Sequence, residues 1–123
     1  MSNHTELEVY KDQYKLLTEI INTIKHIRKD FKRTVGEQLR LTASENVFLI
    51  QKANVHRKNP EKRLECLEKL KDNNDLLFVV IRSSKDSGVI PLKAYARLVE
   101  PLMSVQQQSR KWYNATLKKV NES

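Results

Sequence analysis

The sequence is poor in residues that interrupt regular structure. It has two glycines and three prolines among 123 residues, so we expect few elements, each of them long. Its single cysteine, Cys66, excludes an internal disulfide. Because Cys66 lies in an aliphatic stretch without a histidine or basic cluster to activate it, we interpret it as a buried thiol and not as a nucleophile.

Long apolar runs are also missing. No segment approaches the roughly 20 residues of a membrane span, and the N-terminus lacks the pattern of a signal peptide. We therefore expect a cytoplasmic protein with no membrane partner. A content of 39% hydrophobic and 31% charged residues favours a folded chain over a disordered one. The length fits one domain over residues 1–123.

Apolar side chains recur at steps of three and four residues along most of the chain, which is the pattern of amphipathic helices. We predict helices at about residues 6–29, 35–57, 60–86 and 91–119. On the first helix we expect the core-facing stripe to be Tyr10, Tyr14, Leu17, Ile21 and Ile24.

Three of the predicted helix starts carry capping signals. Thr5 with Glu8, and Thr34 with Glu37, have the spacing of capping boxes. Pro60 suits the first position of the third helix. Four long helices joined by short connections favour antiparallel neighbours. The predicted fold class is therefore all-α, an up-down-up-down four-helix bundle.

The second helix has more apolar surface than a bundle core requires. Leu41, Phe48 and Val55 are seven residues apart and fall roughly opposite the core-facing Leu39 and Ile50. An exposed stripe of this kind is costly in water, so we predict a subunit interface and a homo-oligomer. The alternative is a helix rotated in the bundle, with part of this stripe buried within one chain.

Positive charge is segregated along the sequence. The chain carries a net charge of +8, and all of the excess lies in residues 31–60 and 89–123. Basic helix faces suit a phosphate backbone, which needs charge and position but no base code. The predicted nucleic-acid-binding residues are Lys93, Arg97, Lys111 and Lys118 on the fourth helix, with Arg33, Arg40, Lys52 and Arg57 on the second helix and its flanks.

Signs of catalysis are missing. His4, His26 and His56 lie on different segments without metal-ligand spacing, and no phosphate-binding glycine loop or catalytic triad motif occurs. We therefore expect no enzymatic activity, no metal and no cofactor.

Two portions of the chain resemble the accessory variability protein of diversity-generating retroelements. The first is the run from Phe31 to Ala53, which contains Phe-Lys-Arg-Thr-Val-Gly-Glu-Gln-Leu. The second includes Ile81-Arg82, Asp86, Val89-Ile90, Tyr95 and Trp112. The resemblance implies a basic pentameric ring of four-helix bundles that binds RNA and DNA and associates with the reverse transcriptase of the element.

A broader resemblance is to the four-helix proteins encoded in intervening sequences of bacterial 23S ribosomal RNA genes. Their usual Ile-Ala-Glu-Gly segment is replaced here by Ile50-Gln51-Lys52-Ala53, which favours the retroelement branch. A protein of the intervening-sequence type remains an alternative. So does a protein-interaction scaffold without a nucleic-acid role, in which Leu41, Phe48 and Val55 would dock a foreign helix.

Overall fold

The computed structural model describes residues 4–122, with side chains from residue 8 onward. This part of the chain is helical and contains no strand. Its long helices are α1 (His4–Ile24), α3 (Glu37–Val55), α4 (Pro60–Asp86) and α5 (Leu92–Glu122). A short helix, α2 (Lys29–Phe31), and a π-helical turn, η1 (Lys32–Gly36), lead directly into α3.

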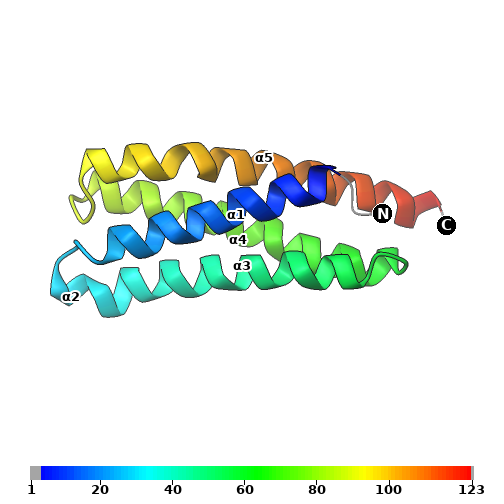
Figure 1. Ribbon diagram of the computed structural model, residues 1–123, viewed down its shortest axis with the longest axis horizontal. Coiled ribbons are helices and arrows are strands. Elements are labelled where there is room, and N and C mark those ends of the chain that lie inside the picture. The colour runs from blue at the N-terminus through cyan, green and yellow to red at the C-terminus, as the bar shows by residue number, and fades with distance from the viewer. Residues whose placement is uncertain (1–3, 123) are drawn as a thin grey trace.

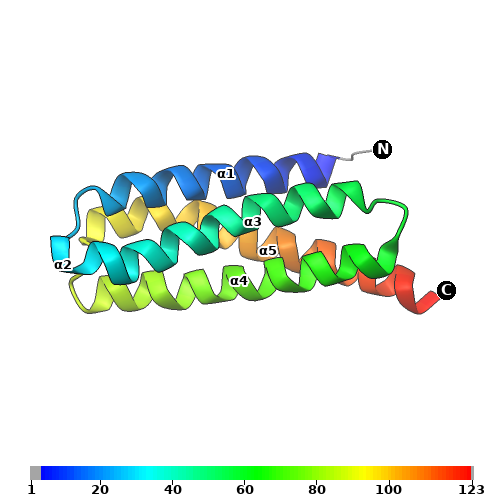
Figure 2. The same cartoon turned by 90° about the horizontal axis from the view of Figure 1, so that it is seen from below.

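The four long helices pack side by side as an antiparallel bundle (Figures 1 and 2). α1 contacts α3 and α5, and α4 contacts the same two helices. α3 and α5 are therefore diagonal to each other. The segment containing α2 and the α4–α5 connection lie at one end, and the α3–α4 connection lies at the other (Figure 2). The predicted helical bundle is confirmed at the level of the single chain.

The break between the first two helices differs from the prediction. The chain leaves helical geometry after Ile24 and re-enters it at Lys29, with Arg28 extended at φ −59° and ψ 144°. The predicted capping box at Thr34 is wrong. Its hydroxyl donates to the Phe31 carbonyl oxygen at 3.3 Å, within a turn that is already helical. The cap predicted at Thr5 lies outside the described side chains.

The π-helical turn is accommodated by a glycine. Gly36 is buried, and a Cβ atom there would meet Ile24 Cγ2 at 3.2 Å and Ile27 Cδ1 at 3.4 Å. The missing side chain lets the end of α1 cross closely over this turn. Phe31 and Val35 then pack against the core from the same turn. Such turns are rare and occur frequently at functional sites.

The other two connections follow the sequence signals. The Asn59 side chain accepts a hydrogen bond from the Lys62 backbone N–H at 3.2 Å, and Pro60 occupies the first turn of α4. After α4, Gly88 adopts a left-handed φ of 79° that favours glycine.

A layer of polar side chains divides the core into two apolar clusters. One cluster, which contains Leu16 and Leu98, occupies the half of the bundle near α2. The other, which contains Leu67 and Trp112, occupies the half near the α3–α4 connection. Each helix contributes one fully buried residue to the layer between them: Gln13, Asn46, Asn74 and Ser109.

Asn74 is the centre of this polar layer. Its side chain exchanges two hydrogen bonds of 3.1 Å with Gln13, accepts one of 2.9 Å from Asn46 and donates one of 3.4 Å to the Ser109 hydroxyl. Buried amides are costly unless they are bonded in this way. The layer therefore aligns the four helices along the bundle axis and fixes their rotation.

The first helix is rotated relative to the prediction. Its core-facing residues include Val9, Leu16 and Ile20, which are at most 1% exposed, whereas Tyr14 is 55% and Ile21 is 41% exposed. Tyr10, Leu17 and Ile24 of the predicted stripe are partly buried and pack against the core, so the prediction is wrong for Tyr14 and Ile21 only. The rotation follows from the polar layer, because Gln13 must point inward to reach Asn74.

None of the helices in residues 4–122 has the length and apolar character of a membrane-crossing segment.

Candidate nucleic-acid interface and assembly surface

The four cations predicted on the last helix lie along one side of α5. Lys93, Arg97, Lys111 and Lys118 are all exposed, and α5 is continuous from the first to the last. At 1.5 Å per residue they extend over about 38 Å. They therefore form a sparse line and not a compact cluster.

Acidic side chains of α1 lie beside this line. Glu19 Oε1 is 3.7 Å from Arg97 Nε, so this cation has an intramolecular partner. Asp12 accepts hydrogen bonds from the Ser104 hydroxyl at 2.7 Å and from Gln108 Nε2 at 2.9 Å. The α1–α5 seam thus combines cations with carboxylates, which lowers its attraction for a polyanion.

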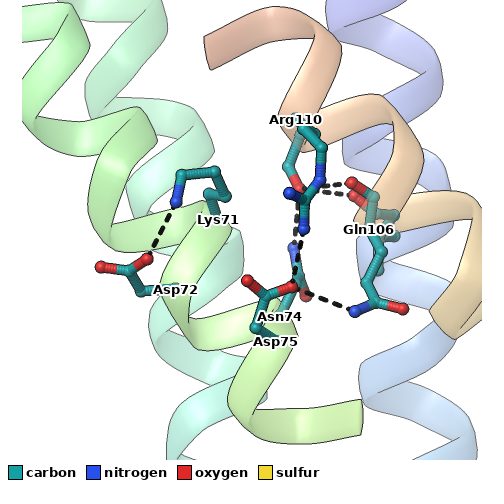
Figure 3. A network of polar contacts seen from close by, with 8 residues as sticks. Lys71, Asp72, Asn74, Asp75, Gln106 and Arg110 are labelled. Carbon is teal, nitrogen blue, oxygen red and sulfur yellow. Dashed lines mark hydrogen bonds and ion pairs between the residues drawn. The ribbon is translucent and has the colours of Figure 1, made fainter. Parts of the chain in front are cut away.

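The opposite seam of α5, toward α4, is also occupied by intramolecular contacts. Asp75 of α4 accepts hydrogen bonds from Gln106 at 3.0 Å and from Arg110 at 3.2 Å (Figure 3). Lys71 pairs with Asp72 at 3.1 Å, and its Nζ lies 5.2 Å from the centre of the Tyr113 ring of α5 (Figure 3). Arg110 and Lys71 are therefore held by contacts within the bundle, and little unpaired charge remains on this face for a ligand.

The cations predicted around the second helix have unlike surroundings. Arg40 makes hydrogen bonds of 3.2 Å and 2.7 Å to the two carboxylate oxygens of Glu37, and this carboxylate raises the pKa of Arg40 through the hydrogen bond and its charge. Lys52 lies with Nζ 5.7 Å from the centre of the Phe48 ring. Arg57 is half-buried, and Arg33 is exposed in η1. The structure does not bring these four residues together.

The Leu41, Phe48 and Val55 stripe lies on the outer side of α3. These side chains are 53%, 57% and 78% exposed, respectively. Leu39 and Ile50 face the core, as predicted. The alternative of a rotated helix with part of the stripe buried inside one chain is therefore wrong.

Further apolar side chains extend this surface beyond the sequence prediction. Tyr14 and Ile21 lie on the side of α1 away from α5, because Asp12, which contacts α5, points in nearly the opposite direction. Leu76 is three residues after Asn73, whose side chain donates to Glu45 of α3.

The hydrogen bonds of the polar layer fix how far each helix is shifted along the bundle axis. They place Tyr14 and Leu76 within about 6 Å of Phe48 along the bundle axis. We call Leu41, Phe48, Val55, Tyr14, Ile21 and Leu76 the α3 apolar surface.

The sequence analysis named only Arg33 from the densest group of cations. From the end of α1 into η1, five cations occur within nine residues and only one carboxylate accompanies them. These five side chains, which we call the basic end, are all exposed: Lys25, Arg28, Lys29, Lys32 and Arg33. The signal was present in the sequence, but dividing the chain at residue 30 split the group between two segments.

An open depression of about 600 Å³ lies within the basic end, lined by Arg28, Lys29, Asp30 and Arg33. Asp30 pairs with Arg28 at 3.0 Å, and the Arg28 guanidinium lies 5.4 Å from the centre of the Phe31 ring. Among the residues from 8 to 122, Lys25, Lys29, Lys32 and Arg33 have no ion pair or hydrogen bond through their charged groups.

The structure adds two observations on possible chemistry. Cys66 is buried and free, as predicted. Over the described part of the chain, no group of three or more histidine, cysteine or carboxylate side chains is arranged to hold a metal ion.

Comparison with known proteins gives no relative. No family model matches the chain, and neither a curated protein nor a solved structure matches it.

Proposed function

We propose that this protein is a non-catalytic, homo-oligomeric nucleic-acid-binding protein of the cytoplasm. The observation that carries the proposal is the number of exposed cations left unpaired on a bundle whose net charge is +8. Unpaired cations on helix surfaces attract phosphates and release their counterions, with little dependence on base sequence. In this proposal the protein holds RNA or DNA by its backbone.

Assembly through the α3 apolar surface is the second part of the proposal. Half-exposed Leu41 and Phe48 and largely exposed Val55 lie in one line on one helix. Contiguous apolar surface on a small protein is typical of a binding site. A second copy of the chain covers this surface in our proposal, and a closed ring, pentameric by the resemblance, repeats the basic surfaces around its circumference.

The resemblance to retroelement accessory proteins supports one biological role. The protein then serves a reverse transcriptase as an accessory subunit and holds the template RNA or the cDNA product. This role rests on the sequence resemblance alone. A neighbouring gene for a reverse transcriptase, with a template and variable repeat pair, is the observation that tests it most directly.

Binding of RNA across a salt series tests the nucleic-acid part. We expect the logarithm of the association constant to fall linearly with the logarithm of salt concentration, by about 0.7 to 0.9 per phosphate contact. Fluorescence anisotropy of a short labelled RNA, from about 50 to about 200 mM salt, measures this slope. Absence of salt-dependent binding at low salt contradicts the proposal and favours the protein-interaction scaffold.

A further inference from the structure

We propose that the basic end, and not the long side of α5, is the main contact surface for nucleic-acid phosphates. This inference rests on the proposed function and specifies its location. The basic end has a higher density of positive charge than the line of cations on α5. Five cations in nine residues leave a local net charge of +4 at the basic end, which is half of the net charge of the whole chain.

The surroundings of the two groups favour the basic end. On α5, Arg97 is paired with Glu19, and Asp12 lies in the same seam. At the basic end the single carboxylate, Asp30, is already paired with Arg28. The charged groups of Lys25, Lys29, Lys32 and Arg33 have no ion pair or hydrogen bond among the described residues. A phosphate approaching this end therefore meets several cations, and the one carboxylate among them, Asp30, is paired with Arg28.

The local backbone explains how so many cations face solvent together. The π-helical turn and the close approach of Ile24 to Gly36 direct Phe31 and Val35 onto the core. Lys32 and Arg33, between them in sequence, are left on the outer side. The depression lined by three cations and by Asp30, the partner of Arg28, gives the surface a concave centre. This rare backbone feature thus coincides with the highest charge density.

The fourth helix adds to the same end. α5 begins at Leu92, at the same end of the bundle as α2 but at the corner diagonal to α3, so Lys93 belongs to this end of the molecule (Figures 1 and 2). Lys111 and Lys118 lie in the other half of the bundle, beyond the polar layer at Ser109. The line of cations predicted on α5 is therefore divided, and only its first part supports the basic end.

The chemistry of the basic end favours phosphates over bases. Its one aromatic side chain, Phe31, is half-buried and lies beneath Arg28. Stacking with unpaired bases requires an exposed aromatic ring, whereas phosphate contacts require only positioned charge. We therefore expect double-stranded RNA to bind at least as tightly as single-stranded RNA.

A matched pair of triple variants tests the location. The first is Lys29→Glu, Lys32→Glu and Arg33→Glu. The second is Lys15→Glu, Lys111→Glu and Lys118→Glu, three exposed cations from the α1–α5 side of the bundle. Both triples change the net charge by the same amount. A difference between them therefore reports position and not total charge.

We expect the first triple to weaken RNA binding about a thousandfold near 0.1 M salt, because each phosphate contact contributes about tenfold there. The salt slope becomes less steep by about 0.9 for each phosphate that the variant no longer neutralises. We expect the second triple to weaken binding by no more than about tenfold, with little change in slope. Far-ultraviolet circular dichroism and light scattering check that both variants remain folded and keep their molar mass. If the first triple does not fold, the same three residues changed to Gln give the test without introducing negative charge.

Several results overturn the inference while leaving nucleic-acid binding intact. Equal weakening in the two triples shows that only net charge matters, and unchanged binding in the first triple places the contact elsewhere. Strong preference for single-stranded RNA points to the exposed rings of Tyr14 and Phe48 instead. If the wild-type protein binds polyglutamate as tightly as RNA, the basic end attracts any polyanion and is not a surface for phosphates in particular. Wild-type protein that binds no RNA overturns the proposed function itself.

Discussion

α3 and α5 occupy diagonal corners of the bundle and differ in what they show to solvent. Each helix faces inward with a regular apolar stripe, and each supplies one residue, Asn46 or Ser109, to the buried polar layer. Their outer sides are unlike. α3 exposes Leu41, Phe48 and Val55, whereas the outer side of α5 is rich in lysine.

This difference agrees with the proposal that the two corners have different partners. Packing of the bundle constrains the residue types on the inner face of a helix. The residue types on its outer face depend on whether that face contacts solvent or another molecule. Exposed cations are well solvated, but an exposed apolar stripe costs about 25 cal/mol for each Å² of apolar surface left in water. In our proposal a second copy covers the α3 apolar surface, whereas the exposed apolar side chains of α5, Leu92 and Met103, lie eleven residues apart and form no such stripe.

Of the changes proposed, Phe48→Glu has the largest expected effect on association through α3. Covering this half-exposed ring contributes about 2 kcal/mol per subunit, and the substitution places a carboxylate in the contact instead. We expect the dissociation constant between subunits to rise at least about a hundredfold. Light scattering across a concentration series then gives the mass of one chain. The matched control is Gln107→Glu, which introduces a negative charge on the exposed side of α5 and keeps the wild-type mass. An unchanged mass in Phe48→Glu refutes assembly through α3.

The change Asn74→Ala tests whether the polar layer aligns α3 and α5 within the bundle. It removes the partner of Gln13 and of Asn46 inside the core, and each orphaned amide costs about 1–3 kcal/mol. We expect the free energy of unfolding in urea to fall by about 3 kcal/mol. The control Asn22→Ala alters an exposed asparagine of α1 and changes this free energy by less than about 0.5 kcal/mol. Equal stability of the two variants means that the layer does not align the helices.

Much of the fold could be predicted because the apolar period is strong. The three- and four-residue steps predicted the four long helices, and Leu39 and Ile50 of α3 face the core as predicted. The seven-residue spacing of Leu41, Phe48 and Val55 predicted an exposed stripe, and all three side chains are exposed. These features depend on local periodicity, which a sequence displays directly.

The remaining features depend on contacts between distant residues. On α1 two apolar stripes compete, and the core face includes polar Gln13 because Asn74, 61 residues away, pairs with it. A search for apolar residues alone selects the wrong stripe. The π-helical turn likewise depends on Ile24 and Ile27 packing over Gly36. The basic end depends on no contact between distant residues. Counting charges over nine residues at a time detects it in the sequence.

Single charge reversals on the two helices give the smallest and sharpest test of the comparison. Lys52 lies over the Phe48 ring at the edge of the α3 apolar surface, and Lys111 is exposed on α5. In the proposed subunit contact, Lys52→Glu replaces this cation with a carboxylate beside the covered ring at a cost of about 0.5–1 kcal/mol, so we expect the dissociation constant between subunits to rise about twofold to fivefold. Lys111→Glu leaves that constant unchanged and weakens RNA binding by no more than about tenfold. Light scattering and anisotropy on both variants separate the two effects. Loss of subunit association in Lys111→Glu shows that the copies meet through α5, and full association in Lys52→Glu shows that Lys52 lies outside the subunit contact.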